Sequence, residues 1–295
     1  MNAVAAKQAV LVSTDWLEAQ LGRSEVRVVD VRGQVLPPGR HPRYVAKRAE
    51  YEAGHVPGAV FVDWTRDIVD PDDPVPVQVA RPDAFGEAMG ALGIGDETLV
   101  VAYDDYDHIF AGRLVWALRY YGHDAACILD GGFSRWVAEN RPTSREEPGP
   151  TPARFTPHRR DALRRTADEV MNSLGRADVL LLDARPEDQY AGLVTAAKQS
   201  GHIPGARNVP YARLVDPLTS KFLPPGELRR VFAEAGIEVE RLPKEVIVYC
   251  NGGVSCTTPL TALRILGRED VAVYDGSWNE WGGDAARPIK TGRDP

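Results

Sequence analysis

One cysteine stands where an apolar run of the chain meets a glycine-rich loop. Residues 246–249 are apolar or aromatic, and Cys250 follows them directly, shortly before Gly252 and Gly253. The run predicts a buried strand, and the residues after the loop predict a helix. Backbone N–H groups at a helix start have no partner within the helix and stabilise an anion. We therefore expect Cys250 to be a thiolate of lowered pKa. Such a thiolate can attack sulfane sulfur and carry it as a persulfide.

The alternative is that Cys250 is a small buried residue, which is the more common role of a single cysteine after a strand. The loop favours the reactive interpretation, because glycine lets backbone N–H groups turn inward. No His or Cys cluster has the spacing of a zinc site, so neither a metal nor another cofactor is expected. The predicted site is catalytic Cys250 with a binding loop of Asn251, Gly252, Gly253, Val254 and Ser255.

The sequence pattern around this loop occurs twice in the chain. Gly-His-Val-Pro-Gly-Ala at 54–59 recurs as Gly-His-Ile-Pro-Gly-Ala at 201–206, and three further blocks recur in the same order. Four matched blocks at nearly constant spacing indicate an internal duplication. The position of Cys250 is occupied by Asp104 in the first copy. An aspartate cannot carry sulfur, so we expect the first copy to be catalytically silent.

Each copy alternates short apolar runs with longer helical patterns, which predicts an α/β fold with a mainly parallel sheet flanked by helices. We expect two similar domains at 10–140 and 160–285, joined by a proline-rich linker at 141–159. The expected strands are 26–31, 98–103, 126–129, 179–182, 246–249 and 271–274, and the expected helices include 82–92, 111–121, 227–235 and 259–266.

The chain from about residue 10 to 283 resembles the tandem-domain rhodanese family of thiosulfate and 3-mercaptopyruvate sulfurtransferases. The motifs that carry the resemblance are Asp-Ala-Arg at 183–185, the repeated motif at 201–206, the loop 250–255 and Asp-Gly-Ser-Trp-Asn-Glu-Trp at 275–281. The resemblance implies two rhodanese-like domains and a sulfurtransferase that moves sulfur from thiosulfate to cyanide, a thiol or a dithiol. It also places a substrate-binding arginine on Arg185, for which a surface or interdomain salt bridge is the alternative.

The chain departs from this family at three positions. Gly252 stands where thiosulfate enzymes have lysine and mercaptopyruvate enzymes have serine. Gln189 stands where the mercaptopyruvate enzymes carry a second arginine. These departures favour thiosulfate as donor, with 3-mercaptopyruvate as the alternative. Cys256 replaces a small residue, and we expect it to pack rather than to take part in redox chemistry.

Two further classes of protein compete with this interpretation. A cysteine phosphatase needs an arginine at the end of the loop, yet none occurs between Cys250 and Arg264. A non-catalytic rhodanese-like binding module is the second alternative to a sulfurtransferase, and the reactivity of Cys250 separates these two.

Composition bounds the partners of the protein. The 295 residues carry a formal net charge of -7, which argues against nucleic-acid binding. No run approaches the roughly 18 apolar residues that a membrane helix requires, and residues 1–10 do not read as a secretory signal. Three cysteines do not suggest a disulfide scaffold. We therefore expect a cytoplasmic protein that acts on small molecules and binds neither nucleic acid nor membrane.

Overall fold

The computed structural model describes residues 6–37, 40–194 and 197–295. Contacts within the chain divide it into two compact units. Each unit contains a five-stranded parallel sheet with helices on both faces, so the predicted α/β class is confirmed. Unit 1 comprises Met1–Pro71, Val79–Arg160 and Pro217–Lys221, and unit 2 comprises Asp72–Gln78, Asp161–Asp216 and Phe222–Pro295.

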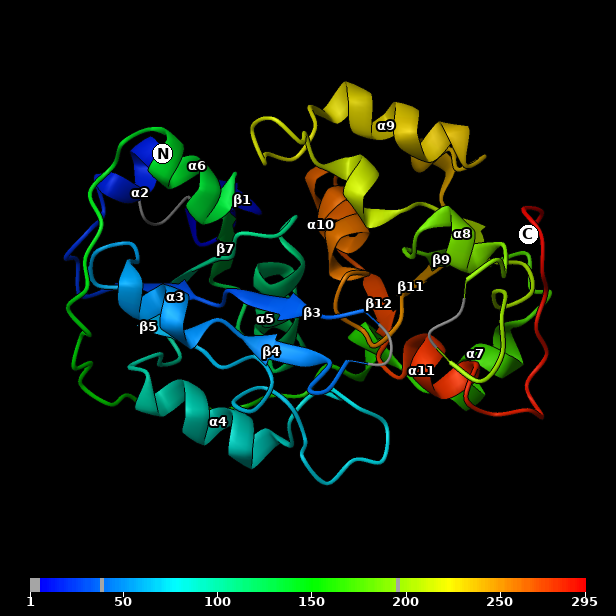
Figure 1. Cartoon of the computed structure of the whole chain (residues 1–295), viewed down its shortest axis with the longest axis horizontal. Coiled ribbons are helices and arrows are strands. Elements are labelled where there is room, and N and C mark those ends of the chain that lie inside the picture. Colours follow the sequence, from blue (N-terminus) through cyan, green and yellow to red (C-terminus); the bar gives the residue numbers. More distant parts are fainter. Residues whose placement is uncertain (1–5, 38–39, 195–196) are drawn as a thin grey trace. The chain divides into compact units, whose positions relative to one another are not determined.

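The sheet of unit 1 has the strand order β1-β7-β6-β2-β5, with every pair parallel. A short antiparallel pair, β3 and β4, lies outside this sheet. The elements of this half of the chain (Figure 1) are β1 (Leu11–Val12), α2 (Thr14–Glu18), β2 (Val26–Asp30), β3 (Gly33–Val35), β4 (Tyr44–Ala46), α3 (Arg48–Ala53), β5 (Val60–Phe61), α4 (Pro82–Ala91), β6 (Leu99–Tyr103), α5 (Ile109–Tyr120), β7 (Ala126–Leu129) and α6 (Gly132–Ala138).

Both faces of the unit 1 sheet are covered. On one face, alternate residues of β6 pack with Leu17 of α2 and Trp136 of α6 in a single apolar cluster. On the other face, α5 packs on β6 and β7. Because successive side chains of a strand point to opposite faces, a strand covered on both sides must be apolar throughout. All five residues of β6, Leu99–Tyr103, are buried.

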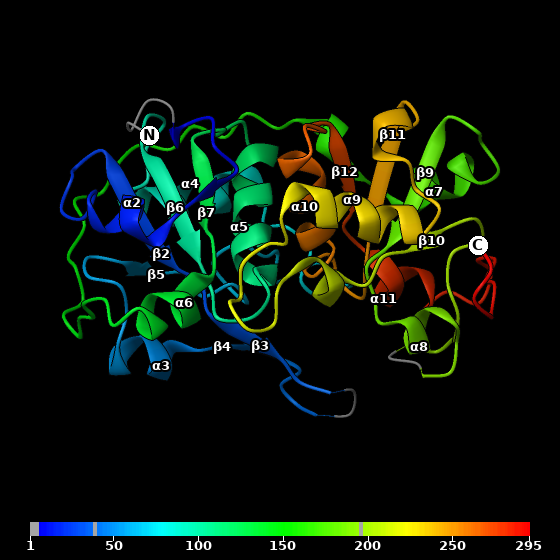
Figure 2. The ribbon, with the colours of Figure 1, turned by 90° about the horizontal axis from the view of Figure 1, so that it is seen from above.

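The sheet of unit 2 repeats this plan with the order β10-β9-β11-β12-β8, again entirely parallel. Figure 2 shows β12, β11 and β9 side by side. The elements of this half are η1 (Asp161–Leu163), β8 (Arg164–Arg165), α7 (Ala167–Ser173), β9 (Val179–Asp183), α8 (Glu187–Tyr190), β10 (Arg207–Asn208), η2 (Tyr211–Leu214), α9 (Pro225–Glu234), η3 (Val239–Arg241), β11 (Glu245–Tyr249), α10 (Thr257–Ile265), β12 (Val271–Tyr274) and α11 (Ser277–Trp281).

The core of unit 2 sets the central strand between two helical layers. Ile247 and Tyr249 of β11 pack with residues of α7 and α11, including Trp278 and Trp281. Helix α10 packs on β11 and β12. The carboxyl end of β11 therefore opens directly into the loop that leads to α10, as the sequence predicts.

The proline-rich stretch 141–159, which the sequence predicts as a linker, packs along unit 1. Ala153 donates its backbone N–H to Gly90, and His158 donates to Tyr121, at 2.9 Å in each case. These backbone hydrogen bonds fix the stretch against α4 and the end of α5, so it is not a free spacer.

Among the described residues, no helix is long and apolar enough to span a membrane.

Candidate active site

Cys250 lies at the carboxyl end of β11, the central strand of its sheet, between β9 and β12. The residue is only 1% exposed. Seven residues, 250–256, connect β11 to α10, and Gly253 takes a φ of +73°. A residue with a side chain is strained at this φ, so glycine is the residue that suits the turn. The loop therefore leads from the end of β11 to α10 and leaves the cysteine buried.

The loop supplies hydrogen-bond donors to the Cys250 sulfur. Burial alone would raise the pKa of this thiol, but four donors outweigh that effect. They are the Cys256 thiol, the Ser255 hydroxyl and the backbone N–H groups of Cys256 and Gly252. Together they lower the pKa of Cys250 from the ordinary 9.0 to about 5. Cys250 is therefore a buried thiolate at neutral pH, which is the form that acts as a nucleophile.

Ser277, the first residue of α11, ties the loop to the next strand. Its Oγ accepts hydrogen bonds from the backbone N–H groups of Cys250 at 3.2 Å and Gly253 at 3.0 Å. The same hydroxyl donates to the carbonyl of Tyr274 at 2.8 Å. Ser277 is fully buried and takes a φ of 51°, a conformation that costs a residue with a side chain free energy. Sequence reasoning gave Ser277 no role. The available signal was that serine occurs here only in the copy that contains the cysteine.

The remaining loop residues are placed as follows. The Asn251 amide nitrogen donates to Gln189 Oε1 at 3.0 Å, and the Asn251 carbonyl oxygen accepts from the backbone of Asn279. The Asn251 side-chain oxygen is buried without a hydrogen-bond partner among the described residues. The Val254 carbonyl accepts from the Thr257 hydroxyl at 2.7 Å, which fastens the loop to the first turn of α10. The structure thus brings the predicted loop together around Cys250.

Arg185 is 1% exposed and lies in a buried ion pair. Its Nε donates to both oxygens of Asp183 at 3.0 and 3.1 Å, and its Nη2 donates to the carbonyl of Gly201 at 2.7 Å. The guanidinium also lies 4.3 Å from the ring centre of Trp278. These contacts bind the end of β9 to the turn that contains Gly201. They support a structural role, and contact with a sulfur donor stays a prediction.

The first copy offers a direct comparison for this arginine. Arg32 donates from Nε to both oxygens of Asp30, at 3.1 and 2.9 Å, and from Nη2 to the carbonyl of Gly54 at 2.7 Å. Its guanidinium lies 4.0 Å from the ring centre of Phe133. The same contacts therefore occur in a unit without the loop cysteine. An arginine that served only the sulfur donor would have no reason to be held in this way there.

Asp104 occupies, in the loop of unit 1, the position that Cys250 has in unit 2. Its carboxylate accepts four backbone N–H groups at 2.8–3.2 Å, from Tyr106, His108, Phe110 and Ala111. Burial is the largest influence and raises the pKa of Asp104 from the ordinary 3.8 to about 7, against the effect of these donors. Its carbonyl accepts from Phe133 N at 2.8 Å, just as the Cys250 carbonyl accepts from Trp278 N at 3.0 Å. Both units thus build the same anion loop.

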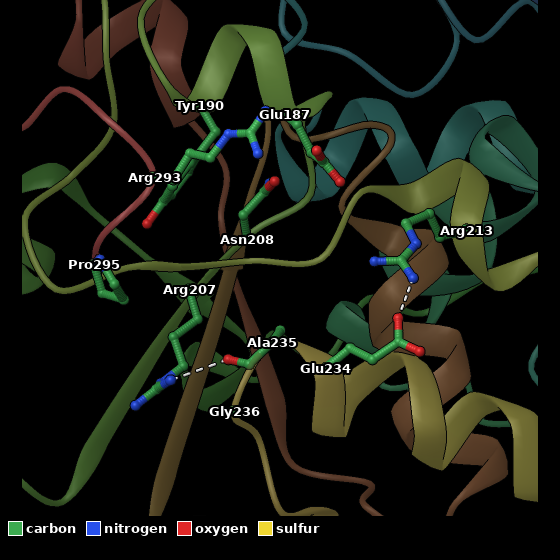
Figure 3. Close-up of a pocket in the computed structure, with 10 residues that line it drawn as sticks. All are labelled: Glu187, Tyr190, Arg207, Asn208, Arg213, Glu234, Ala235, Gly236, Arg293 and Pro295. Carbon is green, nitrogen blue, oxygen red and sulfur yellow. Dashed lines mark hydrogen bonds and ion pairs between the residues drawn. The ribbon is translucent and has the colours of Figure 1, made fainter.

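A cavity of about 490 Å³ in unit 2 is lined by charged side chains from α8, β10, α9 and the last residues of the chain. Figure 3 shows Arg213 paired with Glu234 and Arg207 bonded to the carbonyl of Ala235. Cys250 is absent from the described residues that line it. The cavity and the cysteine loop are therefore separate features.

No group of three or more metal-binding side chains occurs in the parts of the chain that the structure covers.

The fold and the site define a class of protein: an α/β chain with a duplicated unit, in which a strand delivers a cysteine thiolate into a ring of hydrogen-bond donors. The family model described as rhodanese-like domain matches residues 13–139 and 166–284. The chain belongs to the rhodanese family and carries its domain twice.

Individual relatives agree with this assignment. The sulfur carrier protein TtuD of Thermus thermophilus is 34% identical over 97% of this chain and 98% of its own length. The thiosulfate sulfurtransferase of Rattus norvegicus is 34% identical over 92% of this chain and 91% of its own length. The crystal structure of SseA from Escherichia coli, described as a 3-mercaptopyruvate sulfotransferase, is 29% identical. It aligns with a TM-score of 0.80 over 92% of this chain and 99% of its own length. The predicted enzyme class, a sulfurtransferase, is confirmed.

Proposed function

We propose that Cys250 takes sulfur from thiosulfate as a persulfide and passes it to a thiophilic acceptor such as cyanide or a thiol. The observation that carries the proposal is the buried thiolate with a pKa of about 5 inside its ring of donors. The thiolate attacks the sulfane sulfur of thiosulfate, and a bond forms between the two sulfur atoms. The sulfur–sulfur bond of thiosulfate breaks, and sulfite leaves with the electron pair. The acceptor then removes the outer sulfur and restores the thiolate.

The same donors suit the persulfide anion, because the negative charge of the persulfide lies close to the position of the thiolate charge. N–H and O–H groups that are fixed before the reaction stabilise an anion without rearranging. Ser277 supports this role indirectly, since it holds the N–H groups of Cys250 and Gly253. Both chemical states of the cysteine can therefore use one loop.

Thiosulfate is the proposed donor because Gln189, the side chain that contacts the loop, is uncharged. Gln189 contacts Asn251 through a neutral amide, whereas a carboxylate donor is best held by a second arginine. Gly252 supplies only its backbone N–H, and no side chain that could manage a proton. Thiosulfate needs neither, since its leaving group, sulfite, carries no carbon that must be protonated. The missing lysine at this position predicts weak binding and a high KM.

The relatives support a sulfur-transfer role without choosing among acceptors, because their names include a sulfur carrier protein and a thiosulfate sulfurtransferase. We further propose that unit 1 is catalytically silent, since Asp104 stands in its loop, and that the protein works in the cytoplasm. The free state of Cys127, Cys250 and Cys256 supports that compartment.

Mass spectrometry of the intact protein tests the cysteine assignment. After thiosulfate treatment and removal of excess donor, Cys250→Ser should gain nothing, while Cys127→Ser should gain sulfur as the wild type does. Cys127 is the matched control because it is a fully buried cysteine of unit 1. Sulfur found on Cys127, or on the Cys250→Ser variant, would contradict the assignment.

Parallel kinetics test the donor. With cyanide as acceptor, kcat/KM should be higher for thiosulfate than for 3-mercaptopyruvate. The opposite order would replace the proposed donor with 3-mercaptopyruvate and leave the persulfide on Cys250 in place.

A further inference from the structure

Both units carry a groove beside the end of a helix, and in only one unit does a segment of the chain cover it. In unit 1 the groove lies at Gly93, two residues beyond α4, and in unit 2 it lies at Gly236, two residues beyond α9. The two glycines have left-handed φ angles of 70° and 71°. Each donates its backbone N–H to the carbonyl three residues earlier, at 3.0 and 2.8 Å. The two positions are therefore equivalent in the duplicated fold.

The edge strand beside each groove confirms this equivalence. Val60 of β5 and Arg207 of β10 are each the first residue after the repeated Gly-His-x-Pro-Gly-Ala motif. Val60 pairs with Val29, the fourth residue of β2, and Arg207 pairs with Leu182, the fourth residue of β9. The groove of unit 2 thus has an arginine where the groove of unit 1 has a valine.

In unit 1, residues 150–156 cover the groove. A Cβ on Gly93 would lie 3.1 Å from the Pro150 side chain, so the proline sits directly against the glycine. The carbonyl of Arg154 accepts from the backbone N–H of Asp96 at 3.2 Å. The segment has neither helical nor strand structure. The groove of unit 1 therefore binds a proline-containing peptide segment through its backbone and its side chains.

The equivalent groove of unit 2 is a cavity of about 470 Å³. Its walls are mainly apolar and include Val179, Ile237 and Leu242. The described residues that line it come only from 177–180, Arg207 and 236–243, so no segment like 150–156 lies over it. A mainly apolar hollow with a few polar groups is the usual form of a binding site.

A backbone donor of this groove is also left without a partner. Val239 follows Gly236 by three residues, as Asp96 follows Gly93 in unit 1. The backbone N–H of Val239 makes no hydrogen bond to another described residue. In unit 1 the N–H at this position binds the carbonyl of the covering segment. The N–H of Val239 is therefore placed to bind a peptide carbonyl in the same way.

Arg207 adds a charge that the covered groove lacks. Its Nη1 donates to the carbonyl of Ala235 at 3.0 Å (Figure 3). A Cβ on Gly236 would lie 2.4 Å from this nitrogen, so the glycine makes room for the guanidinium. Nε and Nη2 make no hydrogen bond to a described residue, and such a pair of donors suits a carboxylate. A charge on an edge strand can also prevent strand pairing, but β5 is an edge strand with Val60 at this position.

We propose that the groove of unit 2 binds a peptide segment of a partner protein, with proline or apolar side chains on the cavity walls and a carboxylate on Arg207. Unit 1 shows the mode of binding, because residues 150–156 occupy the equivalent groove there. Segments that lack regular structure and contain proline are common ligands of such grooves. The site is separate from the sulfur chemistry, since Cys250 is not among the described residues that line it.

Peptide titration of the full-length, ¹⁵N-labelled protein tests the proposal. Two synthetic peptides span residues 150–157, one with Pro150→Asp and one with Pro150→Lys, because residue 150 is the one that faces the glycine in unit 1. The aspartate peptide should shift the amide resonances of Gly236 and Val239. The lysine peptide should bind at least about tenfold more weakly, the effect of one lost charge-assisted hydrogen bond.

Arg207→Val separates the carboxylate contact from the apolar contacts. Valine suits this position of the fold, since Val60 has the same register in unit 1. The variant should bind the two peptides equally. Arg229→Gln is the matched control, because Arg229 is an arginine of α9 that pairs with Glu240 and does not line the cavity. It should keep the preference for the aspartate peptide.

Four results would overturn the proposal. The first is the absence of shifts at Gly236 and Val239 with the aspartate peptide. The second is equal affinity of the wild type for both peptides. The third is loss of the preference in Arg229→Gln, which would indicate general attraction to a positive surface. The fourth is a wild-type dimer in light scattering that Leu242→Asp dissociates, which would make a second copy of this chain the occupant of the groove.

Discussion

Replacement of Ser277 should weaken the fold and the nucleophile together. The Ser277→Ala change removes a hydroxyl that accepts from Cys250 N and Gly253 N and donates to the Tyr274 carbonyl, at 2.8–3.2 Å. The site is fully buried, so water does not replace these bonds. At about 1 kcal/mol for each lost bond, the free energy of unfolding should fall by about 3 kcal/mol.

Ser277→Gly is the matched variant, because it loses the same hydroxyl but suits the backbone. Ser277 has a φ of 51°, a conformation that costs residues with a Cβ roughly 1 kcal/mol. The glycine variant should therefore be about 1 kcal/mol more stable than the alanine variant. Urea unfolding of the three proteins measures both differences.

The pKa of Cys250 should change as well. This change distinguishes a residue that positions the loop from one that only stabilises the fold. If the loosened loop stabilises the thiolate by about 1.4 kcal/mol less, the pKa of Cys250 rises by about one unit. At a pH near 5, the thiolate fraction would fall from about a half to about a tenth. The pH profile of iodoacetamide alkylation at Cys250 reports this shift. Unchanged stability and an unchanged profile in Ser277→Ala would refute the role given to this hydroxyl.

Three further predictions follow from the site. Alkylation of wild-type Cys250 should rise with pH around its pKa of about 5 and level off well below the ordinary 9.0, and a midpoint near 9.0 would contradict a stabilised thiolate. Arg185→Ala and Arg32→Ala should each destabilise the protein by about 3–5 kcal/mol, because each strands a buried carboxylate. A rise in KM for thiosulfate confined to Arg185→Ala would establish the predicted donor contact. Asp104, whose folded pKa is raised to about 7 from 3.8, contributes stability below about pH 4 that is lost as pH rises through 7. Relative to Asp104→Asn, the wild type should therefore lose stability between about pH 4 and about pH 7 in urea melts, and parallel stability curves would count against a titrating Asp104.

The sequence predicts the strands and the position of the nucleophile because both depend on local pattern. Residues 246–249 are apolar throughout, as a strand covered on both faces must be, and Cys250 follows them into the loop. The start of α10 differs from the prediction by two residues. The sequence predicts a helix from Pro259, whereas the helix begins at Thr257 in the structure. Proline is tolerated there because the first N–H groups of a helix have no partner within it.

The contacts around the nucleophile could not be predicted, since they join residues that are distant in the chain. Ser277 lies 27 residues beyond Cys250, and only the closure of β12 and α11 over the loop brings them together. The contacts of Arg185 could not be predicted for the same reason. Its motif indicates an arginine at a strand end, but whether the guanidinium meets solvent or a buried carboxylate depends on the packing of the turn at Gly201.

The two copies of the loop differ at the residue that ties the loop of unit 2 to the next strand. Gly132 in unit 1 corresponds to Ser277 in unit 2, and both have positive φ, at 56° and 51°. A Cβ on Gly132 would lie 2.3 Å from the carbonyl oxygen of Asp104, which is closer than such atoms approach. Unit 1 thus has no room for the serine that ties the loop of unit 2. Substitution of Asp104 by cysteine alone would therefore place a thiol in the loop of unit 1 without that support.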